Sequence, residues 1–175
     1  MNGKFNKKER ENIEKILMVI SQNARASSEE ISRKVGLTRQ TINRLLKKMQ
    51  QEKTLWGYAP IFDREEFGKK IFLLLVKLKI SENPDEFLKL VKDDTQIKLN
   101  QDSNFILTAY THGNYDFVIM LAADSTIEAK KITNILINRY RKYFRDVETL
   151  EIITLFREAG IVNPNFKQKW DELFS

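Results

Sequence analysis

The stretch S-S-E-E-I-S-R-K-V-G-L-T-R-Q-T-I-N-R-L-L-K-K-M-Q-Q (residues 27–51) has the pattern of a helix, a tight turn and a second helix. Ser27 and Glu30 form an S-x-x-E capping box, which predicts that the first helix begins at the following residue. Gly36 can adopt the left-handed conformation that ends a helix without steric cost, and Thr38 can cap the next helix. In that second helix, apolar side chains recur at i, i+3, i+4 and i+7, and they are Ile42, Leu45, Leu46 and Met49. The stretch therefore predicts a helix-turn-helix with one buried side.

The opposite side of the second helix carries only amides, hydroxyls and cations. No Asp or Glu occurs in residues 38–51, whereas an ordinary solvated face mixes acids with lysines. Amides and guanidinium groups pair with base edges in the major groove, and lysines neutralise phosphates. A plain surface helix is the alternative, but the accompanying turn favours a helix that reads DNA. In that case Gln40, Asn43 and Arg44 would contact the bases. The candidate DNA-binding residues are Arg39, Gln40, Thr41, Asn43, Arg44, Lys47 and Lys48.

The positive charge of the chain is concentrated near the N-terminus. Residues 1–60 hold 13 Lys and Arg against 6 acids, a net of +7, whereas residues 61–175 hold 17 against 18, a net of −1. This asymmetry is expected of a nucleic-acid-binding module joined to a neutral domain. The sequence has no Cys, which excludes disulfides and thiolate catalysis and fits a reducing cytosol. The longest apolar run, residues 71–76, is too short to span a bilayer, so we expect a cytoplasmic protein without membrane contact.

Around the helix-turn-helix, residues 7–23 read as a first helix with Ile13, Ile16, Leu17 and Ile20 on one face. Residues 55–62 are aromatic and β-favouring and are interrupted by Gly and Pro, which predicts the two-stranded wing of a winged helix. Trp56 and Tyr58 are expected to pack against the helices, with DNA contact as the alternative.

The remainder of the chain alternates strands and helices. We expect a strand at residues 71–80, buried on both faces, and then a helix that begins at Asn83 and Pro84. A hairpin of residues 105–112 and 116–123 should follow. A helix at residues 125–144 and a strand at 147–156 complete the expected order. An extra strand piece is expected around Ile97 and Leu99. This order is the ferredoxin-like βαββαβ arrangement, so the fold class is α+β. One sheet face would stay bare and pair with a second copy, which predicts a homodimer.

The expected domains are residues 1–62, a winged helix-turn-helix DNA-binding domain; 63–70, a connector; 71–160, a ferredoxin-like domain; and 161–175, a C-terminal helical extension. The extension carries Phe166, Trp170, Leu173 and Phe174 at helical spacing, and it is expected to dock on its own domain or on a partner subunit.

With this order of parts, the sequence resembles the Lrp/AsnC-type ("feast/famine") transcription regulators over residues 7–160. The resemblance rests on I-S-R-K-V-G-L-T (residues 31–38) before Thr41 and Ile42, and on Gly57-Tyr58 followed by Phe62-Asp63 and Phe67-Gly68. A third element, G-N-Y-D (residues 113–116), is similar to the G-x-Y-D hairpin of the family's effector domain. The last strand lacks the Thr-x-Thr pattern often seen in the family, and the tail is longer than usual.

The resemblance implies a sequence-specific transcription regulator that binds double-stranded DNA as a dimer and assembles into tetramers or octamers. It also implies that the second domain binds ligand, with a small effector, usually an amino acid, near the hairpin. Carried over, the effector-binding residues are Gly113, Asn114, Tyr115 and Asp116. Asp116 could meet an ammonium group. The alternative is that Gly113 and Asn114 only make a turn, while Asp116 satisfies its own backbone.

Other classes of function fit less well. The sequence has no G-x-S-x-G, G-x-x-x-x-G-K or H-E-x-x-H motif, so we expect no enzyme, no cofactor and no metal site. Its single histidine, His112, lacks a second His or Cys for metal binding. Siroheme decarboxylases share the expected architecture and are the enzymatic alternative, although they would be expected to use several histidines. A non-specific, DNA-wrapping architectural protein is a third alternative that the same residues allow.

Overall fold

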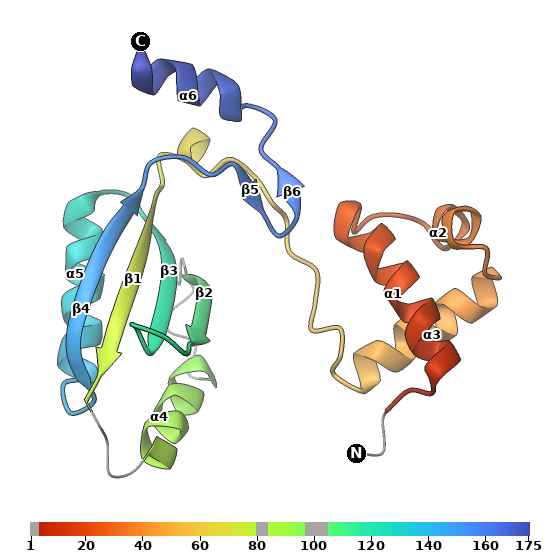
Figure 1. The fold of residues 1–175 in the computed structure, drawn as a ribbon, viewed down its shortest axis with the longest axis horizontal. Helices are drawn as coiled ribbons and strands as arrows, with labels where there is room; N and C mark the ends of the chain where they lie inside the picture. Colours follow the sequence, from red (N-terminus) through yellow and green to blue (C-terminus); the bar gives the residue numbers. More distant parts are fainter. Residues whose placement is uncertain (1–3, 80–83, 97–104) are drawn as a thin grey trace. The chain divides into compact units, whose positions relative to one another are not determined.

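The computed structural model describes residues 4–79, 84–96 and 105–175 of the chain (Figure 1). The chain divides into two compact units, one made of Met1–Phe62 with Leu155–Ser175 and the other of Asp63–Thr154. Each unit contains its own cluster of buried apolar side chains. Within the described ranges, no helix is long and apolar enough to cross a membrane.

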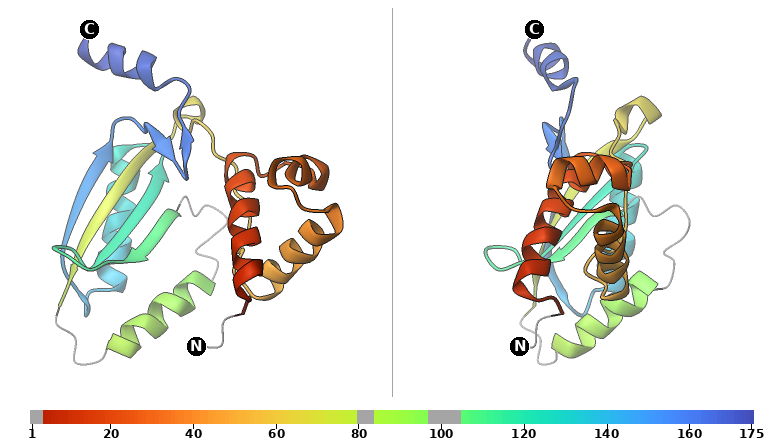
Figure 2. Two further views of the ribbon diagram at one scale, coloured as in Figure 1. Left: turned by 45° about the vertical axis from the view of Figure 1, so that its right-hand side comes forward. Right: turned by 90° about the vertical axis from the view of Figure 1, so that its right-hand side faces the viewer.

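The first unit contains three packed helices, α1 (Lys7–Gln22), α2 (Ser28–Val35) and α3 (Arg39–Gln51), shown in Figures 1 and 2. Asn6, Ser27 and Thr38 cap them, each accepting a hydrogen bond from the backbone N–H three residues further on. Gly36 ends α2 in the left-handed conformation, with φ 71°. The buried core residues are Ile13, Ile16, Ile20, Ile31, Ile42, Leu45 and Met49. The predicted helix-turn-helix and its apolar side are therefore confirmed.

The predicted wing is wrong, because residues 55–62 form no strand in the described chain. A ribbon needs two strands that exchange backbone hydrogen bonds, and Gly57 and Pro60 interrupt this short stretch. Trp56 is 95% exposed, and its indole N–H donates to the Lys53 carbonyl oxygen at 3.0 Å. Tyr58 is exposed as well, so the expectation that these two rings pack against the helices is also wrong.

The second unit begins with a short 3₁₀ helix, η1 (Glu65–Phe67), and then forms a four-stranded sheet with two helices. Its elements are β1 (Lys70–Leu78), α4 (Pro84–Gln96), β2 (Phe105–Tyr110), β3 (Phe117–Ala123), α5 (Thr126–Arg139) and β4 (Phe144–Ile152). The strand order is β2-β3-β1-β4, and all three pairings are antiparallel. This order confirms the ferredoxin-like βαββαβ arrangement. The strand piece expected around Ile97 and Leu99 lies outside the described residues.

The boundary between α5 and β4 differs from the prediction. The helix expected to continue to residue 144 ends at Arg139, and the last strand begins at Phe144 and ends at Ile152. In the intervening turn, the backbone N–H groups of Tyr143 and Phe144 both donate to the Tyr140 carbonyl oxygen. The rings of Tyr140 and Phe144 stack with their centroids 5.1 Å apart. These aromatic residues follow the helix at helical spacing in the sequence, which is why the apolar pattern predicted a longer helix than the structure has.

Among the described residues of this unit, α4 and α5 cover one face of the sheet. Phe72, Leu74 and Val76 of β1 are fully buried with Phe87 of α4 and with the apolar side of α5. Leu73 and Leu75 alternate with them and are half-buried. Leu107 and Leu150 are exposed on β2 and β4. The expectation that β1 is buried on both faces is therefore wrong for the described chain.

After β4 the chain forms a small hairpin and a final helix. The hairpin pairs β5 (Arg157–Glu158) with β6 (Ile161–Val162), and positive φ angles at Ala159 and Gly160 make its turn. The sequence pattern did not predict it. The expected helical extension is present as α6 (Phe166–Phe174). The aromatic rings of α6 pack against Phe156, which precedes the hairpin. The ring centroid of Phe156 lies 5.9 Å from that of Phe166 and 5.7 Å from that of Trp170.

Candidate functional site

The side of α3 opposite the core is exposed. Gln40, Asn43, Arg44 and Lys47 are exposed there together with Arg39 at the start of the helix, whereas Thr41 and Lys48 are half-buried at its margin. The side chains of Gln40 and Lys47 make no hydrogen bond or ion pair with any other described residue. The candidate DNA-binding residues therefore lie together on one surface of a single helix, and two of them are available for a partner.

Glu9 of α1 lies against this surface and holds two of its cations. Its carboxylate oxygens accept from Arg44 Nη1 at 3.0 Å and from Lys48 Nζ at 2.8 Å. The Glu9 side chain is only 13% exposed, while that of Arg44 is 58% exposed. The hydrogen bonds from Lys48 and Arg44 lower the pKa of Glu9 to about 2. The guanidinium of Arg44 is thus oriented by a carboxylate before any partner binds.

Glu9 is itself positioned by the start of α1. Its backbone N–H donates to Asn6 Oδ1 at 2.9 Å, and the Asn6 backbone N–H donates to Glu9 Oε2 at 3.3 Å. This reciprocal capping box fixes the carboxylate beside α3. Sequence reasoning missed Glu9, because it counted acids only within residues 38–51. The Asn6–Glu9 spacing was a signal for the helix start, but not for the contact with α3.

The other candidates on α3 have neighbours within the helix-turn-helix. Ser28 Oγ donates to Asn43 Oδ1 at 2.5 Å, which ties the Asn43 amide to the start of α2. Arg39 lies 3.6 Å from a Glu29 carboxylate oxygen, and the Thr41 hydroxyl is hydrogen-bonded to the Thr38 hydroxyl at 2.9 Å. The amide N–H₂ of Asn43 can still donate. These contacts orient the polar surface of α3 without covering it.

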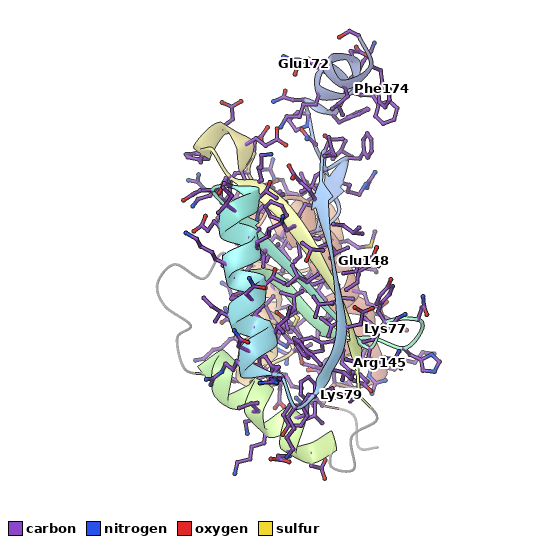
Figure 3. The ribbon with its side chains drawn as sticks, turned by 90° about the vertical axis from the view of Figure 1, so that its left-hand side faces the viewer. Lys77, Lys79, Arg145, Glu148, Glu172 and Phe174 are labelled. Atoms are coloured by element: carbon purple, nitrogen blue, oxygen red, sulfur yellow. The ribbon has the colours of Figure 1, made fainter. Side chains whose placement is uncertain are left out.

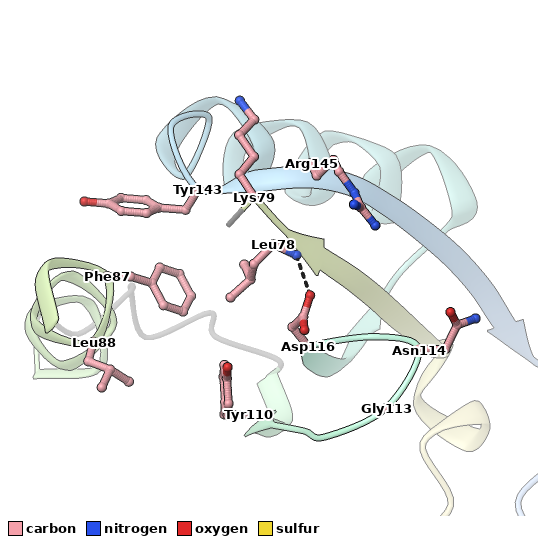
Figure 4. A pocket seen from close by; sticks show the side chains of 10 residues that line it. All are labelled: Leu78, Lys79, Phe87, Leu88, Tyr110, Gly113, Asn114, Asp116, Tyr143 and Arg145. Atoms are coloured by element: carbon pink, nitrogen blue, oxygen red, sulfur yellow. Dashed lines mark hydrogen bonds between the residues drawn. The ribbon is translucent and has the colours of Figure 1, made fainter. Parts of the chain in front are cut away.

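The second unit contains a pocket of about 630 Å³ at one end of its sheet (Figure 4). Its lining comes from the end of β1, α4, the β2–β3 loop and the start of β4, and comprises Leu78, Lys79, Phe87, Leu88, Tyr110, Gly113, Asn114, Asp116, Tyr143 and Arg145. Three of the four predicted effector-binding residues therefore line a pocket. Within the hairpin, Asp116 Oδ2 accepts a hydrogen bond from the Leu78 backbone N–H at 2.8 Å.

Tyr115 is not part of this lining. Its hydroxyl donates to Glu148 of β4, and this hydrogen bond raises the pKa of Tyr115 above its ordinary value. The ammonium of Lys77 lies 5.2 Å from the centroid of the Tyr115 ring. Figure 3 labels Lys77 of β1, Lys79 just after it, and Arg145 and Glu148 of β4. Among the described residues, no group of three or more His, Asp or Glu side chains could hold a metal ion.

Known proteins match this chain in two ways: family and sequence matches cover part of the chain, and solved structures match nearly the whole fold. The family described as winged helix-turn-helix DNA-binding matches residues 9–53. Two HTH-type transcriptional regulators of Pyrococcus furiosus are 27% identical over 84 residues and 34% identical over 78 residues. These alignments cover 48% and 44% of this chain and 57% and 50% of the relatives. The chain thus spans about half the length of the curated relatives it matches, which are described as regulators and not as enzymes.

Solved structures match over nearly the whole chain. An AsnC family transcriptional regulator from Agrobacterium tumefaciens has a TM-score of 0.64 at 12% identity, covering 93% of this chain and 99% of that one. A transcriptional regulator from Neisseria meningitidis, solved as its L-Met complex, has a TM-score of 0.63 at 16% identity and covers 94% and 99%. At these identities the likeness shows the fold. The resemblance stated from the sequence is confirmed at the level of the fold: residues 9–53 match the winged helix-turn-helix DNA-binding family, and the chain has the fold of the Lrp/AsnC-type transcription regulators.

Proposed function

We propose that the chain is a sequence-specific, DNA-binding transcription regulator of the Lrp/AsnC type that acts in the cytoplasm. The observation that carries the proposal is the exposed, acid-free side of α3, where amides and cations gather on one surface. A helix with this surface fits the major groove, which is wide enough to admit it. The concentration of positive charge in residues 1–60 supports the same partner.

The residues of α3 divide into two roles in this proposal. Gln40, Asn43 and Arg44 contact bases, because amides and guanidinium groups can pair bidentately with adenine and guanine. Arg39, Thr41, Lys47 and Lys48 contact phosphates and set the register. Lys48 shares the carboxylate of Glu9 with Arg44, so its contribution to phosphate binding is smaller than that of Lys47.

The second unit serves assembly and regulation in this proposal. The uncovered sheet face, with half-buried Leu73 and Leu75 and exposed Leu107 and Leu150, is suited to pairing with a second copy. A homodimer built in this way places two copies of α3 on one duplex, and dimers assemble further into tetramers or octamers. A small effector, an amino acid in the regulator from Neisseria meningitidis, binds near Gly113, Asn114, Tyr115 and Asp116.

The test is the affinity of the full-length protein for two duplexes, one enriched from a random library by repeated selection on the protein and one scrambled. Fluorescence anisotropy at fixed salt gives both dissociation constants. We expect the selected duplex to bind about 10³-fold or more tightly. Equal affinity for both duplexes would favour the architectural, DNA-wrapping alternative, and no binding to either at low salt would contradict the proposal.

A further inference from the structure

The pocket of the second unit has two cations at its edge and one acid. Lys79 directly follows β1 and Arg145 lies near the start of β4, and both line the pocket (Figure 4). Lys79 Nζ donates to the Arg141 carbonyl oxygen at 2.9 Å, which holds the ammonium in place. Arg145 is exposed and makes no ion pair or hydrogen bond with any other residue that the structure describes. A guanidinium beside a pocket without an internal partner can bind a carboxylate.

The one acid of the lining, Asp116, is engaged by the chain. Its Oδ2 accepts from the Leu78 N–H at 2.8 Å, while its own backbone N–H donates to the Val76 carbonyl oxygen at 2.9 Å. Its carbonyl oxygen accepts from the Thr111 N–H at 2.8 Å. Asp116 therefore joins the β2–β3 loop to the end of β1. The nearby carboxylate of Glu86 is neutralised by Lys142 Nζ at 2.9 Å, so the pocket presents a net positive charge.

The rest of the lining is apolar or aromatic. Phe87 is buried at the back of the pocket, next to Tyr143, with ring centroids 5.3 Å apart. Leu88 and Tyr110 are 53% and 66% exposed, although they line a pocket. A volume of about 630 Å³ lies within the range of small-molecule sites, which combine apolar walls with a few placed polar groups.

We propose that this pocket binds a small organic acid with an aromatic or branched apolar body, whose carboxylate is held by Arg145. The body lies against Phe87, Leu88 and Tyr110. Because recognition is assigned to the carboxylate and the apolar body, a ligand without an ammonium group is expected to bind. This inference rests on the proposed regulatory function, in which the pocket is the effector site. It differs from an amino-acid site in that it assigns recognition of the ligand to Arg145 and not to the hairpin acid.

The test titrates the full-length protein with four related probes by isothermal titration calorimetry. These are 3-phenylpropanoate, L-phenylalanine, phenethylamine and acetate, which vary the carboxylate, the ammonium and the aromatic body separately. We expect 3-phenylpropanoate and L-phenylalanine to bind within about tenfold of each other, and phenethylamine and acetate to bind at least about tenfold more weakly than 3-phenylpropanoate. Binding of L-phenylalanine alone, equal binding of phenethylamine, or no binding of any probe would overturn the inference.

Two variants locate the site. Arg145→Gln is expected to lower the affinity for 3-phenylpropanoate by about tenfold or more, because it removes the charge of the exposed guanidinium. Lys131→Gln is the matched control, since Lys131 is an exposed cation of α5 outside the pocket lining, and it is expected to leave binding unchanged. Equal effects of both variants would overturn the assignment.

DNA binding is measured on the same preparations to separate the two proposals. Acid binding that depends on Arg145, in a protein that ignores duplex DNA, leaves the pocket assignment standing and contradicts the regulatory function. Selective DNA binding without binding of any probe contradicts the pocket assignment alone.

Discussion

The two candidate sites differ in how their cations are neutralised within the chain. On α3, Arg44 and Lys48 share the carboxylate of Glu9, whereas Arg145 at the pocket of the second unit has no ionic partner among the described residues. A carboxylate beside a recognition helix orients the guanidinium and discourages binding to any polyanion that does not offer the correct bases. An unpaired guanidinium beside an apolar pocket favours a small anion. We therefore expect the first site to favour selectivity between duplexes and the second site to favour binding of a small anion.

The largest effect is expected from the core beneath α3. Leu45 is completely buried, so Leu45→Ala should lower the free energy of unfolding by about 2–5 kcal/mol through lost burial and the cavity left behind. Leu46→Ala, one residue further on and only half-buried, is the control and should cost less. Urea denaturation followed by circular dichroism measures both. Equal costs would show that the buried side of α3 is assigned incorrectly.

The turn before α3 gives the next effect. Gly36 has φ 71°, and Gly36→Ala should therefore destabilise the protein by about 1–2 kcal/mol, the cost of a left-handed conformation for a residue with a Cβ. Gly57→Ala is the matched control, because Gly57 lacks a positive φ and has open space around it. Thermal unfolding of the two variants compares them. A stable Gly36→Ala protein would contradict the left-handed turn.

Glu9→Gln tests the carboxylate that distinguishes the α3 surface. The folded-state pKa of Glu9 is about 2, below its ordinary value of 4.5, so the ion pairs stabilise the fold above pH 4.5 and lose their effect as the pH falls toward 2. The stability curves of wild type and Glu9→Gln should differ near pH 6 and converge at low pH. Glu11→Gln, an exposed acid on the same helix, serves as the control. A constant difference at all pH values would contradict the ion pairs.

The same variant is expected to change DNA binding. In Glu9→Gln, Arg44 and Lys48 lose their ionic partner and can bind the phosphates of any duplex. The affinity for scrambled DNA should therefore rise, and the slope of log affinity against log salt concentration should steepen by roughly one unit. Anisotropy titrations between low and moderate salt measure the slope. If selectivity improved in Glu9→Gln, the idea that Glu9 restrains non-specific binding would be wrong.

The smallest effect is expected from Lys47. Because Lys47 is exposed and unpaired among the described residues, Lys47→Ala should weaken binding to selected and scrambled duplexes alike and reduce the salt slope by about 0.9. Lys131→Ala, which removes an exposed cation of the second unit, should leave the slope unchanged. A loss confined to the selected duplex would mean that Lys47 reads bases and does not bind a phosphate.

Features set by local sequence were predictable. The caps at Ser27 and Thr38, the left-handed Gly36 and the apolar spacing of α3 all depend on neighbours within one turn, and the structure has each of them. The strand and helix order of the second unit was also predictable, because apolar periodicity and the Gly113-Asn114 turn are local signals. Features that depend on distant partners were not predictable in this way.

Three features show what local patterns leave out. Residues 55–62 have strand-forming composition, but they pair with no strand in the part of the chain that the structure describes. The helix at residues 125–144 appeared longer than it is, because Tyr140 and Tyr143 belong to the core through a turn and not through helical periodicity. The Glu9–Arg44 pair, and the pocket that Lys79 and Arg145 both line, bring together residues far apart in the sequence. One sequence contains no local pattern that links residues so far apart, so these contacts could not be predicted from it.

The most direct test of the account is the binding of Arg44→Ala to the selected and scrambled duplexes at one salt concentration. Arg44 is an exposed cation of α3 whose guanidinium is hydrogen-bonded to Glu9. The account predicts a loss of about 1–3 kcal/mol for the selected duplex, with much less change for the scrambled one, so that preference between them falls. Unchanged affinity and unchanged preference in a folded Arg44→Ala protein would contradict the claim that this side of α3 reads DNA.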